Sequence, residues 1–497
     1  MVEGRYDFYY FSGQNTNVSD FLQKDDELNL CLNFFTSKFG GKKVRPGYTT
    51  FLDAIDTHPI RNLVYYNFPN GDKGIIRVSN KNFYKYAFSG STWGASVLTR
   101  TVDATEAYTT LLSLLHFSNG TDDYYTFDGS TFTDGSGANY PKAFTLTSWN
   151  SRVYAGNFTN TGSSPNLYGP SRLEYSAVDW TTNYVDPWNS DNNDSATAGE
   201  TGVDSGNRGN IHAMTVLNDR VTIYKDSGIY RYNGSGILRV PFADSIFPTS
   251  VVTSETTGYD YFLSTSGIYK GDGQTVQLAS FKIQDIIYDT FLKYGFGNPF
   301  SFSYDKHVYF YVGQIYLKSI GETIANGMFV YNELYDEWYI WSLGHAMTCF
   351  GYYIDPTTKR KVLISGDANG NTYKWGTEFT SDATIPIAYR MRTKYWDFGS
   401  PESTKTFGRY NISTDLGAGG NLAFAIDESD EYKPVDFVSG VLTKNWVKTE
   451  DFSDFKTLSI EIQGSTTDSR PEFLGITFKP KEQEERLGGG KAQSSKK

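Results

Sequence analysis

The sequence predicts an all-β protein: a β-propeller of six or seven blades, followed by an appended C-terminal β-sandwich and bounded by extended termini. Three observations lead to this prediction. Apolar runs are short and rich in β-branched and aromatic residues, as at 221–224 and 307–312. Asn-Gly or Asp-Gly pairs bound many of these runs. A tyrosine-containing pattern also recurs at about the length of a propeller blade.

The glycine pairs explain how such short strands are connected. Glycine accepts the positive φ angle that two-residue hairpin turns require. The pairs are Asn70-Gly71, Asn119-Gly120, Asp128-Gly129, Asn233-Gly234, Asp272-Gly273 and Asn369-Gly370. Helical periodicity is weak, and the best candidate is 283–294, where Ile286, Ile287 and Leu292 would share one face.

The repeat is clearest between two segments that lie 39 residues apart. IYRYNG at 229–234 matches IYKGDG at 268–273, and looser copies mark tyrosines at 84, 125, 175, 230, 269, 331 and 373. The intervals of 39 to 62 residues suit four-stranded blades of about 40–50 residues with insertions. We therefore expect Tyr230 and Tyr269 at equivalent places in two blades. One or two β-sandwiches with regular hairpins are the alternative, and the repeat favours the propeller.

The N-terminal part precedes the repeat. Residues 1–60 are expected to form an arm with the first strands, and 61–380 the propeller. The apolar run at 28–35 must find pairing partners for its backbone. One option closes the first and last blades, because a circular array of sheets needs a terminal strand to cover its edges. The other option lays the arm across a neighbouring subunit.

Three further segments have their own composition. Segment 185–208 has few large apolar residues, which predicts a long exposed insertion in the propeller. Alternating strands then predict a separate β-sandwich over 385–480. The tail at 481–497 is charged and then rich in Gly, Ser and Lys, which is typical of a flexible segment that orders only on a partner.

Composition excludes several classes of protein. Asp and Glu number 56 against 45 Lys and Arg, a net charge of −11, whereas a dedicated duplex-DNA binder needs clustered basic residues. The two cysteines, Cys31 and Cys349, lie far apart in apolar settings, which favours two buried free thiols over one long-range disulfide. The first residues lack the pattern of a secretory signal, and the longest apolar run, 111–117, is too short to span a bilayer. We therefore expect no membrane-spanning segment and synthesis in a cytoplasm.

No pattern in the sequence predicts a catalytic site. The five histidines are scattered, and neither a nucleophile elbow nor a phosphate-binding loop occurs. A calcium loop at 191–194 is a weak candidate, because it lacks the terminal bidentate Glu. Segment 365–373 is similar to the Asp-box turn of sialidase propellers, which is a structural hairpin. We therefore predict a protein that is not an enzyme, with no catalytic residues, no cofactor and no metal ligands.

Several short motifs follow one another in a characteristic order. They are GGKKVRPG at 40–47, LTSWNSRVY at 146–154, SRLEYS at 171–176, TIYKDSGIY at 222–230, YFLSTSGIY at 261–269, VYN at 330–332, EWY at 337–339 and GDANG at 366–370. In this order they resemble the tail hub or nozzle proteins of short-tailed bacteriophages, a family that includes the packaged-DNA stabilisation proteins. The resemblance extends over residues 1–480.

The resemblance implies a structural protein of the virion tail. Its propeller and appended β domain would assemble as a homo-oligomeric ring, a hexamer, below the portal and adaptor, at the head-tail connection. The ring would surround or close the DNA exit channel, retain packaged DNA and help its ejection into the host. Implied partners are the adaptor, a tail fibre or spike, a needle or plug, and phage DNA passing without sequence recognition. The protein would be made in the host cytoplasm.

Two other functions compete with the tail hub. A receptor-binding tail protein could hold host glycans through propeller loops, and a glycan-cleaving propeller is the enzymatic alternative. Glycosidases need two carboxylates that flank the scissile bond, and among 56 acidic residues the sequence singles out no such pair. The hub and the receptor-binding protein differ in whether the protein lies in a ring or at the tip of an outward spike.

Overall fold

The chain forms two compact units in a computed structural model. It describes residues 5–19, 22–38, 40–88, 90, 92–135, 140–158, 169–178, 188, 198–204, 209–399, 401–415, 420–429, 431–435, 447–448 and 455–482. The propeller unit comprises 46–336 and 342–385, and the terminal unit comprises 1–45, 337–341 and 386–497. The chain therefore passes between the units after residues 45, 336, 341 and 385.

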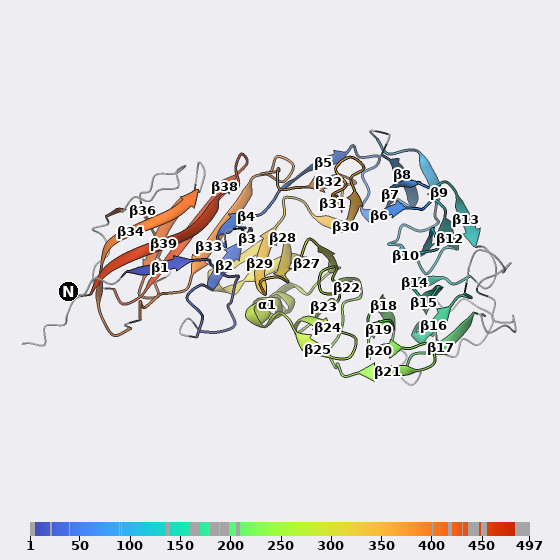
Figure 1. Cartoon of the computed structure of the whole chain (residues 1–497), viewed down its shortest axis with the longest axis horizontal. Coiled ribbons are helices and arrows are strands. Elements are labelled where there is room, and N and C mark those ends of the chain that lie inside the picture. The colour runs from blue at the N-terminus through green and yellow to red at the C-terminus, as the bar shows by residue number, and fades with distance from the viewer. Residues whose placement is uncertain are drawn as a thin grey trace, which may run out of the picture. The chain divides into compact units, whose positions relative to one another are not determined.

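The first four sheets of the propeller unit each contain four antiparallel strands in chain order (Figure 1). Blade 1 has β6 (Ile60–Asn67), β7 (Lys73–Ser79), β8 (Asn82–Ala87) and β9 (Ser96–Thr99). Blade 2 has β10 (Ala107–Leu111), β11 (Leu114–Ser118), β12 (Tyr124–Phe127) and β13 (Phe132–Gly135). Blade 3 has β14 (Ala143–Trp149), β15 (Arg152–Phe158), β16 (Arg172–Tyr175) and β17 (Gly199–Gly202). Blade 4 has β18 (Ile211–Val216), β19 (Val221–Lys225), β20 (Gly228–Tyr232) and β21 (Ile237–Val240).

Three more sheets complete the propeller unit, which confirms the β-propeller and gives it seven blades. Blade 5 has β22 (Val252–Thr253), β23 (Asp260–Ser264), β24 (Gly267–Gly271) and β25 (Val276–Leu278). The propeller unit contributes to blade 6 the strands β26 (Phe300–Tyr304), β27 (His307–Leu317) and β28 (Glu322–Asn332). Blade 7 has β30 (Met347–Ile354), β31 (Lys361–Asp367), β32 (Thr372–Trp375) and β5 (Tyr48–Leu52).

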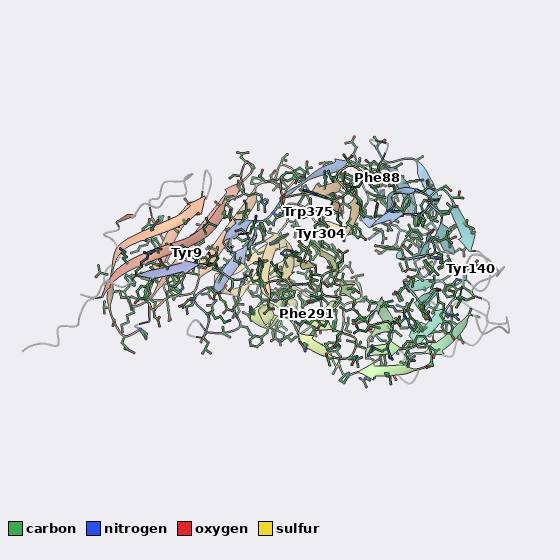
Figure 2. All side chains as sticks on the ribbon, in the orientation of Figure 1. Tyr9, Phe88, Tyr140, Phe291, Tyr304 and Trp375 are labelled. Atoms are coloured by element: carbon green, nitrogen blue, oxygen red, sulfur yellow. The ribbon has the colours of Figure 1, made fainter. Side chains whose placement is uncertain are left out.

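The last blade is closed by a strand from the other end of the unit. β5 pairs antiparallel with β32, with Tyr48 opposite Trp375 and Leu52 opposite Thr372. Phe88 of blade 1 also packs on Tyr353 of blade 7, their ring centroids 5.3 Å apart (Figure 2). A terminal strand therefore does cover an edge of the ring, but it lies at 48–52 and not at 28–35. The propeller unit accordingly begins at residue 46, before the expected boundary at 61.

The tyrosine repeat marks one position in every blade. The tyrosines at 84, 125, 175, 230, 269, 331 and 373 each lie on the third strand of their blade, namely β8, β12, β16, β20, β24, β28 and β32. The hydroxyl of Tyr230 lies 3.0 Å from Ser227 Oγ, and that of Tyr269 lies 2.8 Å from Ser266 Oγ. Tyr230 and Tyr269 are therefore equivalent, as predicted.

The glycines of the predicted turns have the expected positive φ, but the turns are not two-residue hairpins: the strand pairs around Asp128, Asn233 and Asp272 enclose four residues each, and the pair around Asn70 encloses five. All six glycines of the Asn-Gly and Asp-Gly pairs have positive φ, between 78° and 102°. In blades 2, 4 and 5 the preceding side chain also accepts backbone N–H groups two and three residues onward, from Asp128, Asn233 and Asp272. Local chemistry alone therefore specifies these hairpins.

Helix α1 (Gln284–Tyr294) matches the helical candidate, but the expected common face of Ile286, Ile287 and Leu292 does not form. Ile286, Ile287 and Thr290 are buried, whereas Leu292 is 63% exposed. At 3.6 residues per turn, Leu292 lies on the opposite side of the helix from Ile286 and Ile287. Short 3₁₀ turns occur at Gly169–Ser171, Pro248–Ser250, Phe281–Ile283 and Lys318–Ile320.

The expected insertion at 185–208 is partly regular structure. Gly199–Gly202 forms β17, the outer strand of blade 3, with Thr201 opposite Leu173. Trp188 is buried at 6% exposure. The expectation of a long exposed loop is therefore wrong for these residues, because β16 supplied an edge to which even a Gly- and Thr-rich segment could pair. Residues 185–187, 189–197 and 205–208 lie outside the described residues.

The terminal unit consists of two sheets built from both ends of the chain. One contains β1 (Tyr6–Tyr9), β3 (Phe34–Thr36), β4 (Lys42–Val44), β39 (Glu472–Glu482), β34 (Lys405–Asp415) and β37 (Val447–Lys448). The other contains β29 (Glu337–Ser342), β2 (Leu28–Leu32), β33 (Ile387–Thr393), β38 (Leu458–Thr466), β35 (Asn421–Ile426) and β36 (Lys433–Val435). Tyr410 and Phe424 pack between the sheets with ring centroids 5.2 Å apart, as expected for a sandwich.

The N-terminal residues do not form a free arm. β2 pairs antiparallel with β33 and parallel with β29, and β1 pairs with β39. Phe8 stacks on Trp396 at 4.0 Å between ring centroids, and Leu28, Cys31 and Phe34 are fully buried. Within the apolar run at 28–35, β2 therefore finds its partners in the C-terminal half of the same chain and β3 pairs with the neighbouring β4, a third solution beside the two expected. Tail residues 483–497 lie outside the described residues.

Candidate functional site

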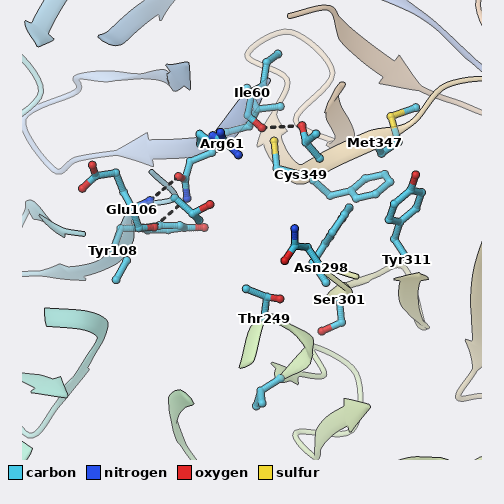
Figure 3. Close-up of a pocket in the computed structure, with 18 of the residues that line it drawn as sticks. Ile60, Arg61, Glu106, Tyr108, Thr249, Asn298, Ser301, Tyr311, Met347 and Cys349 are labelled. Carbon is cyan, nitrogen blue, oxygen red and sulfur yellow. Dashed lines mark hydrogen bonds between the residues drawn. The ribbon is translucent and has the colours of Figure 1, made fainter. Parts of the chain in front are cut away.

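A cavity of about 860 Å³ lies among the first strands of the propeller blades (Figure 3). It is lined by residues of blades 1, 2, 3, 5, 6 and 7 and of the segments that lead into them. Its volume is in the range of pockets that hold a small molecule, about 300–1,000 Å³. Sequence reasoning predicted no site residues, so every residue of this cavity was missed.

A buried amide joins blades 1 and 2 at the cavity wall (Figure 3). Asn62 Oδ1 accepts the backbone N–H of Glu106 at 2.8 Å, and Asn62 Nδ2 donates to the Glu106 carbonyl at 3.0 Å. The Glu106 carboxylate turns away to Arg100, with Nη2 at 2.6 Å, and burial raises its pKa despite this partner. Asn62 thus satisfies two backbone groups at the start of an inner strand, where no neighbouring strand can reach them.

Arg61 forms a second connection at the same junction. Its Nη2 and Nε atoms lie 2.8 Å and 3.3 Å from a single oxygen of Asp103, Oδ2. Burial alone would raise the pKa of Asp103, but the hydrogen bonds and charge of Arg61 hold that pKa below its usual value. The charge of Arg61 is therefore compensated by its own partner. Its remaining nitrogen, Nη1, has no hydrogen-bond partner among the described residues.

Hydroxyl groups join other neighbouring blades in the same way. Thr348 Oγ1 of blade 7 donates to the Ile60 carbonyl of blade 1 at 2.7 Å. Ser301 Oγ of blade 6 donates to the Ser250 carbonyl beside blade 5, also at 2.7 Å, and Thr249 Oγ1 donates to the Pro299 carbonyl. Most polar groups of the cavity wall therefore stabilise the ring and do not point at a reaction centre.

Two aromatic rings on the wall remain partly uncovered. Tyr108 on β10 is 45% exposed and Phe144 on β14 is 47% exposed, although both line the cavity. Asn298, before β26, is also exposed, and its amide has no hydrogen-bond partner within the described ranges. These groups, together with Arg61, are the part of the wall that could contact a ligand.

The cavity thiol is a poor nucleophile. Cys349 lines the cavity but is only 8% exposed, and burial raises its pKa to about 12. At neutral pH it is therefore a thiol rather than the reactive thiolate. Cys31 is buried in the terminal unit with its pKa also raised by burial to about 12, so the prediction of two buried free thiols is confirmed.

The motifs examined for chemistry have structural roles where they are described. In the segment similar to an Asp box, Asp367 Oδ1 accepts the backbone N–H groups of Asn369 and Asn371, both at 2.8 Å, which closes a hairpin. The calcium candidate at 191–194 lies outside the described residues. Elsewhere, the described part of the chain holds no cluster of three His, Cys, Asp or Glu side chains that could bind a metal ion. Over the same residues, no helix has the length and apolar character to cross a membrane.

Comparisons with known proteins give similarity to solved structures alone. No protein-family model and no curated protein matches the chain. The extracellular domain of BT4673 from B. thetaiotaomicron aligns with a TM-score of 0.42 and 10% identity over 82% of this chain. The chain spans 48% of that structure, about half of its length. YCF48 from Cyanidioschyzon merolae aligns with a TM-score of 0.41 and 9% identity, over 67% of this chain and 99% of YCF48.

Proposed function

We propose that the chain is a structural protein of a bacteriophage tail, the subunit of a hexameric hub or nozzle ring below the portal and adaptor. The supporting observation is the position of the family-like motifs. TIYKDSGIY at 222–230 covers β19 and β20, and YFLSTSGIY at 261–269 covers β23 and β24. Both motifs are thus the central hairpin of a blade, the part of a propeller that is buried on both faces.

In this proposal the DNA passes along the axis of the ring of subunits and not through the propeller. A cavity of about 860 Å³ has the size of a small-molecule pocket, far below what a duplex needs. The net charge of −11 suits a wall that must not retain phosphates. The ring would retain packaged DNA, release it into the host, and contact the adaptor, a fibre or spike and a needle or plug.

The proposal also assigns no catalysis to the protein. Glu106, which lines the cavity, pairs with Arg100, and the lining residue Arg61 pairs with Asp103. A glycan-cleaving enzyme needs one free carboxylic acid and one free carboxylate that flank the scissile bond. Both acids serve instead in ion pairs at the junction of blades 1 and 2.

The test is to locate the protein in the particle. A small peptide tag placed after Lys497, with tag-specific gold labelling of purified virions, should mark a ring at the head-tail junction or below it. The purified protein should form rings with six-fold symmetry at high concentration. Label at the tip of an outward spike would support the receptor-binding alternative. Virions that assemble fully without the protein would overturn the hub proposal.

A further inference from the structure

We propose that the propeller cavity binds a neutral carbohydrate, one or two pyranose rings long, on the aromatic faces of Tyr108 and Phe144. Arg61 and Asn298 would contact its hydroxyl groups. This inference goes beyond the proposed function and does not depend on it, because it concerns a site within a single propeller unit (Figure 3).

The two aromatic rings are supported on one side and open on the other. Tyr108 lies 6.3 Å from Phe117 between ring centroids, in the same blade. Phe144 rests on Gly120, where an added Cβ would meet the Phe144 ring at 2.4 Å. The absence of a side chain at Gly120 therefore leaves the space that the outer end of the Phe144 ring occupies. Tyr108 and Phe144 come from the inner strands of adjacent blades, β10 and β14.

Exposed aromatic rings in a concave site indicate a ligand with an apolar face. Some aromatic rings of the propeller are buried between blades, as Phe83 and Phe117 are, and others, such as Tyr259, are exposed outside the cavity; Tyr108 and Phe144 are partly exposed and also line the cavity. A pyranose ring presents C–H groups on its face, which pack on an aromatic ring, and hydroxyl groups around its edge. The cavity offers both kinds of group, because its lining includes the two aromatic rings together with Arg61 and Asn298.

The charges of the wall favour a neutral ligand. Arg61 is paired with Asp103, and Arg100 with Glu106, so neither arginine offers an uncompensated positive charge to a phosphate or carboxylate. Arg61 Nη1 can still donate a hydrogen bond, and the Asn298 amide can both donate and accept one. Planar groups of this kind can each contact two neighbouring hydroxyls of a sugar.

The experiment is saturation-transfer NMR on the purified full chain with a panel of neutral sugars. The panel contains methyl α-D-glucopyranoside, methyl β-D-galactopyranoside, maltose and lactose, with sialyllactose and adenosine as a charged and a flat aromatic competitor. We expect transfer to the ring protons of at least one neutral sugar. Tyr108→Ala and Phe144→Ala should each reduce that transfer at least five-fold.

Control variants separate loss of the site from loss of the fold. Tyr259→Ala removes an aromatic ring of similar exposure, 39%, outside the cavity and should leave the transfer unchanged. Phe144→Tyr keeps the flat face and should retain binding if Phe144→Ala loses it. The inference is wrong if no neutral sugar shows transfer, if sialyllactose or adenosine binds more tightly, or if the cavity variants bind as well as the wild type. Because the assay uses isolated protein, none of these results bears on the location of the protein in the virion.

Discussion

Buried polar residues near the propeller axis hold neighbouring blades together. Each blade presents the free edge of its first strand to the axis, where backbone groups lack the partners that a continuous sheet supplies. Asn62, Thr348 and Ser301 meet this need from the adjacent blade. Nothing in the sequence distinguishes such residues from other polar residues. The loss of folding free energy when one of them is replaced depends on the buried groups that it leaves unpaired.

Replacing Asn62 by Leu should lower the free energy of unfolding by about 2–4 kcal/mol, because the buried N–H and C=O of Glu106 both lose their partner. Urea unfolding followed by circular dichroism measures the change. Asn298→Leu is the matched control, since this exposed amide has no hydrogen-bond partner among the described residues, and it should change stability by less than about 0.5 kcal/mol. Equal losses for the two variants would contradict the role of Asn62.

His116 should make the protein sensitive to acid. It is fully buried, its Nδ1 lies 2.8 Å from the Tyr124 hydroxyl, and burial lowers its pKa from 6.5 to about 3. The folded state therefore binds this proton less readily than the unfolded state. The contribution of the neutral His116 ring to the free energy of unfolding is fully present above pH 6.5. It is lost as the pH falls from 6.5 towards 3, by at most about 1.4 kcal/mol per pH unit.

The variant His116→Gln isolates that contribution. It lacks the titrating ring, so the stability difference between wild type and variant at pH 7.5 should shrink as the pH is lowered to 4. Urea titrations at several pH values give both curves, and the carboxylates common to the two proteins cancel in the difference. Parallel curves over this range would show that His116 does not titrate as proposed.

At the scale of the element, equal turn sequences can have unequal surroundings. Gly71 and Gly370 both follow Asn and both have positive φ, 94° and 82°. A Cβ added at Gly71 would meet no atom within 4 Å, whereas one at Gly370 would lie 2.1 Å from the Asp56 carbonyl oxygen. The first turn therefore needs glycine for its backbone alone, and the second also for close packing against the segment between β5 and β6.

Gly370→Ala should accordingly destabilise the protein by more than about 3 kcal/mol, since backbone must move to admit the methyl group. Gly71→Ala should cost only the strain of a non-glycine residue at positive φ, about 1–2 kcal/mol. Thermal unfolding of the two variants under identical conditions compares them directly. A smaller loss for Gly370→Ala than for Gly71→Ala would mean that the 366–370 turn does not pack on Asp56.

On the scale of the whole molecule, one N-terminal strand closes the ring. Tyr48 on β5 is 1% exposed, and its ring centroid lies 4.6 Å from that of Trp375 and 4.9 Å from that of Tyr373. We expect Tyr48→Ala to cost about 3–5 kcal/mol, as for a large buried aromatic. Hydrogen exchange should accelerate in blades 1 and 7 together, because their junction depends on this strand.

A partly buried aromatic ring on the outer strand of another blade, Phe132, serves as the control. Phe132 on β13 packs on Phe127 with ring centroids 4.5 Å apart, both within blade 2. Phe132→Ala should accelerate exchange mainly in blade 2 and at its contact with blade 1. If hydrogen exchange in the Tyr48→Ala variant is accelerated only in β5 and β32, then β5 can detach without opening the ring, which would contradict the prediction.

The C-terminal tail should contribute nothing to the stability of the isolated chain. Strand β39 ends at Glu482, which pairs with Lys405 of β34, so residues 483–497 follow the last described strand. Truncation after Glu482 should change the melting temperature by less than about 1 °C, while truncation after Pro471 removes β39 and should prevent the terminal unit from folding. Calorimetry of the two truncated proteins measures both effects. If the proposed tail assembly is correct, an assay of incorporation into virions shows whether residues 483–497 contact another subunit.

Local information in the sequence determined the all-β class, a repeat that fits six or seven blades, and the glycines with positive φ in the turns. Hydrophobic pattern and turn chemistry act over a few residues, which is why Tyr230 and Tyr269 align on their sequence pattern alone. The cavity could not be predicted in this way. Nothing local distinguishes the half-exposed Tyr108 from the buried Tyr124, since the difference depends on which strand faces the axis of a closed ring.

Tertiary structure alone decided how the ends of the chain are used. The runs at 28–32 and 48–52 are both short apolar strands, yet β2 joins β33 in the terminal unit and β5 joins β32 in the propeller. Each pairing links residues more than 300 positions apart, so the choice depends on which sheet edges are free once the rest of the chain has folded. Local sequence specifies that a strand forms, and the three-dimensional arrangement of unpaired edges specifies where it binds.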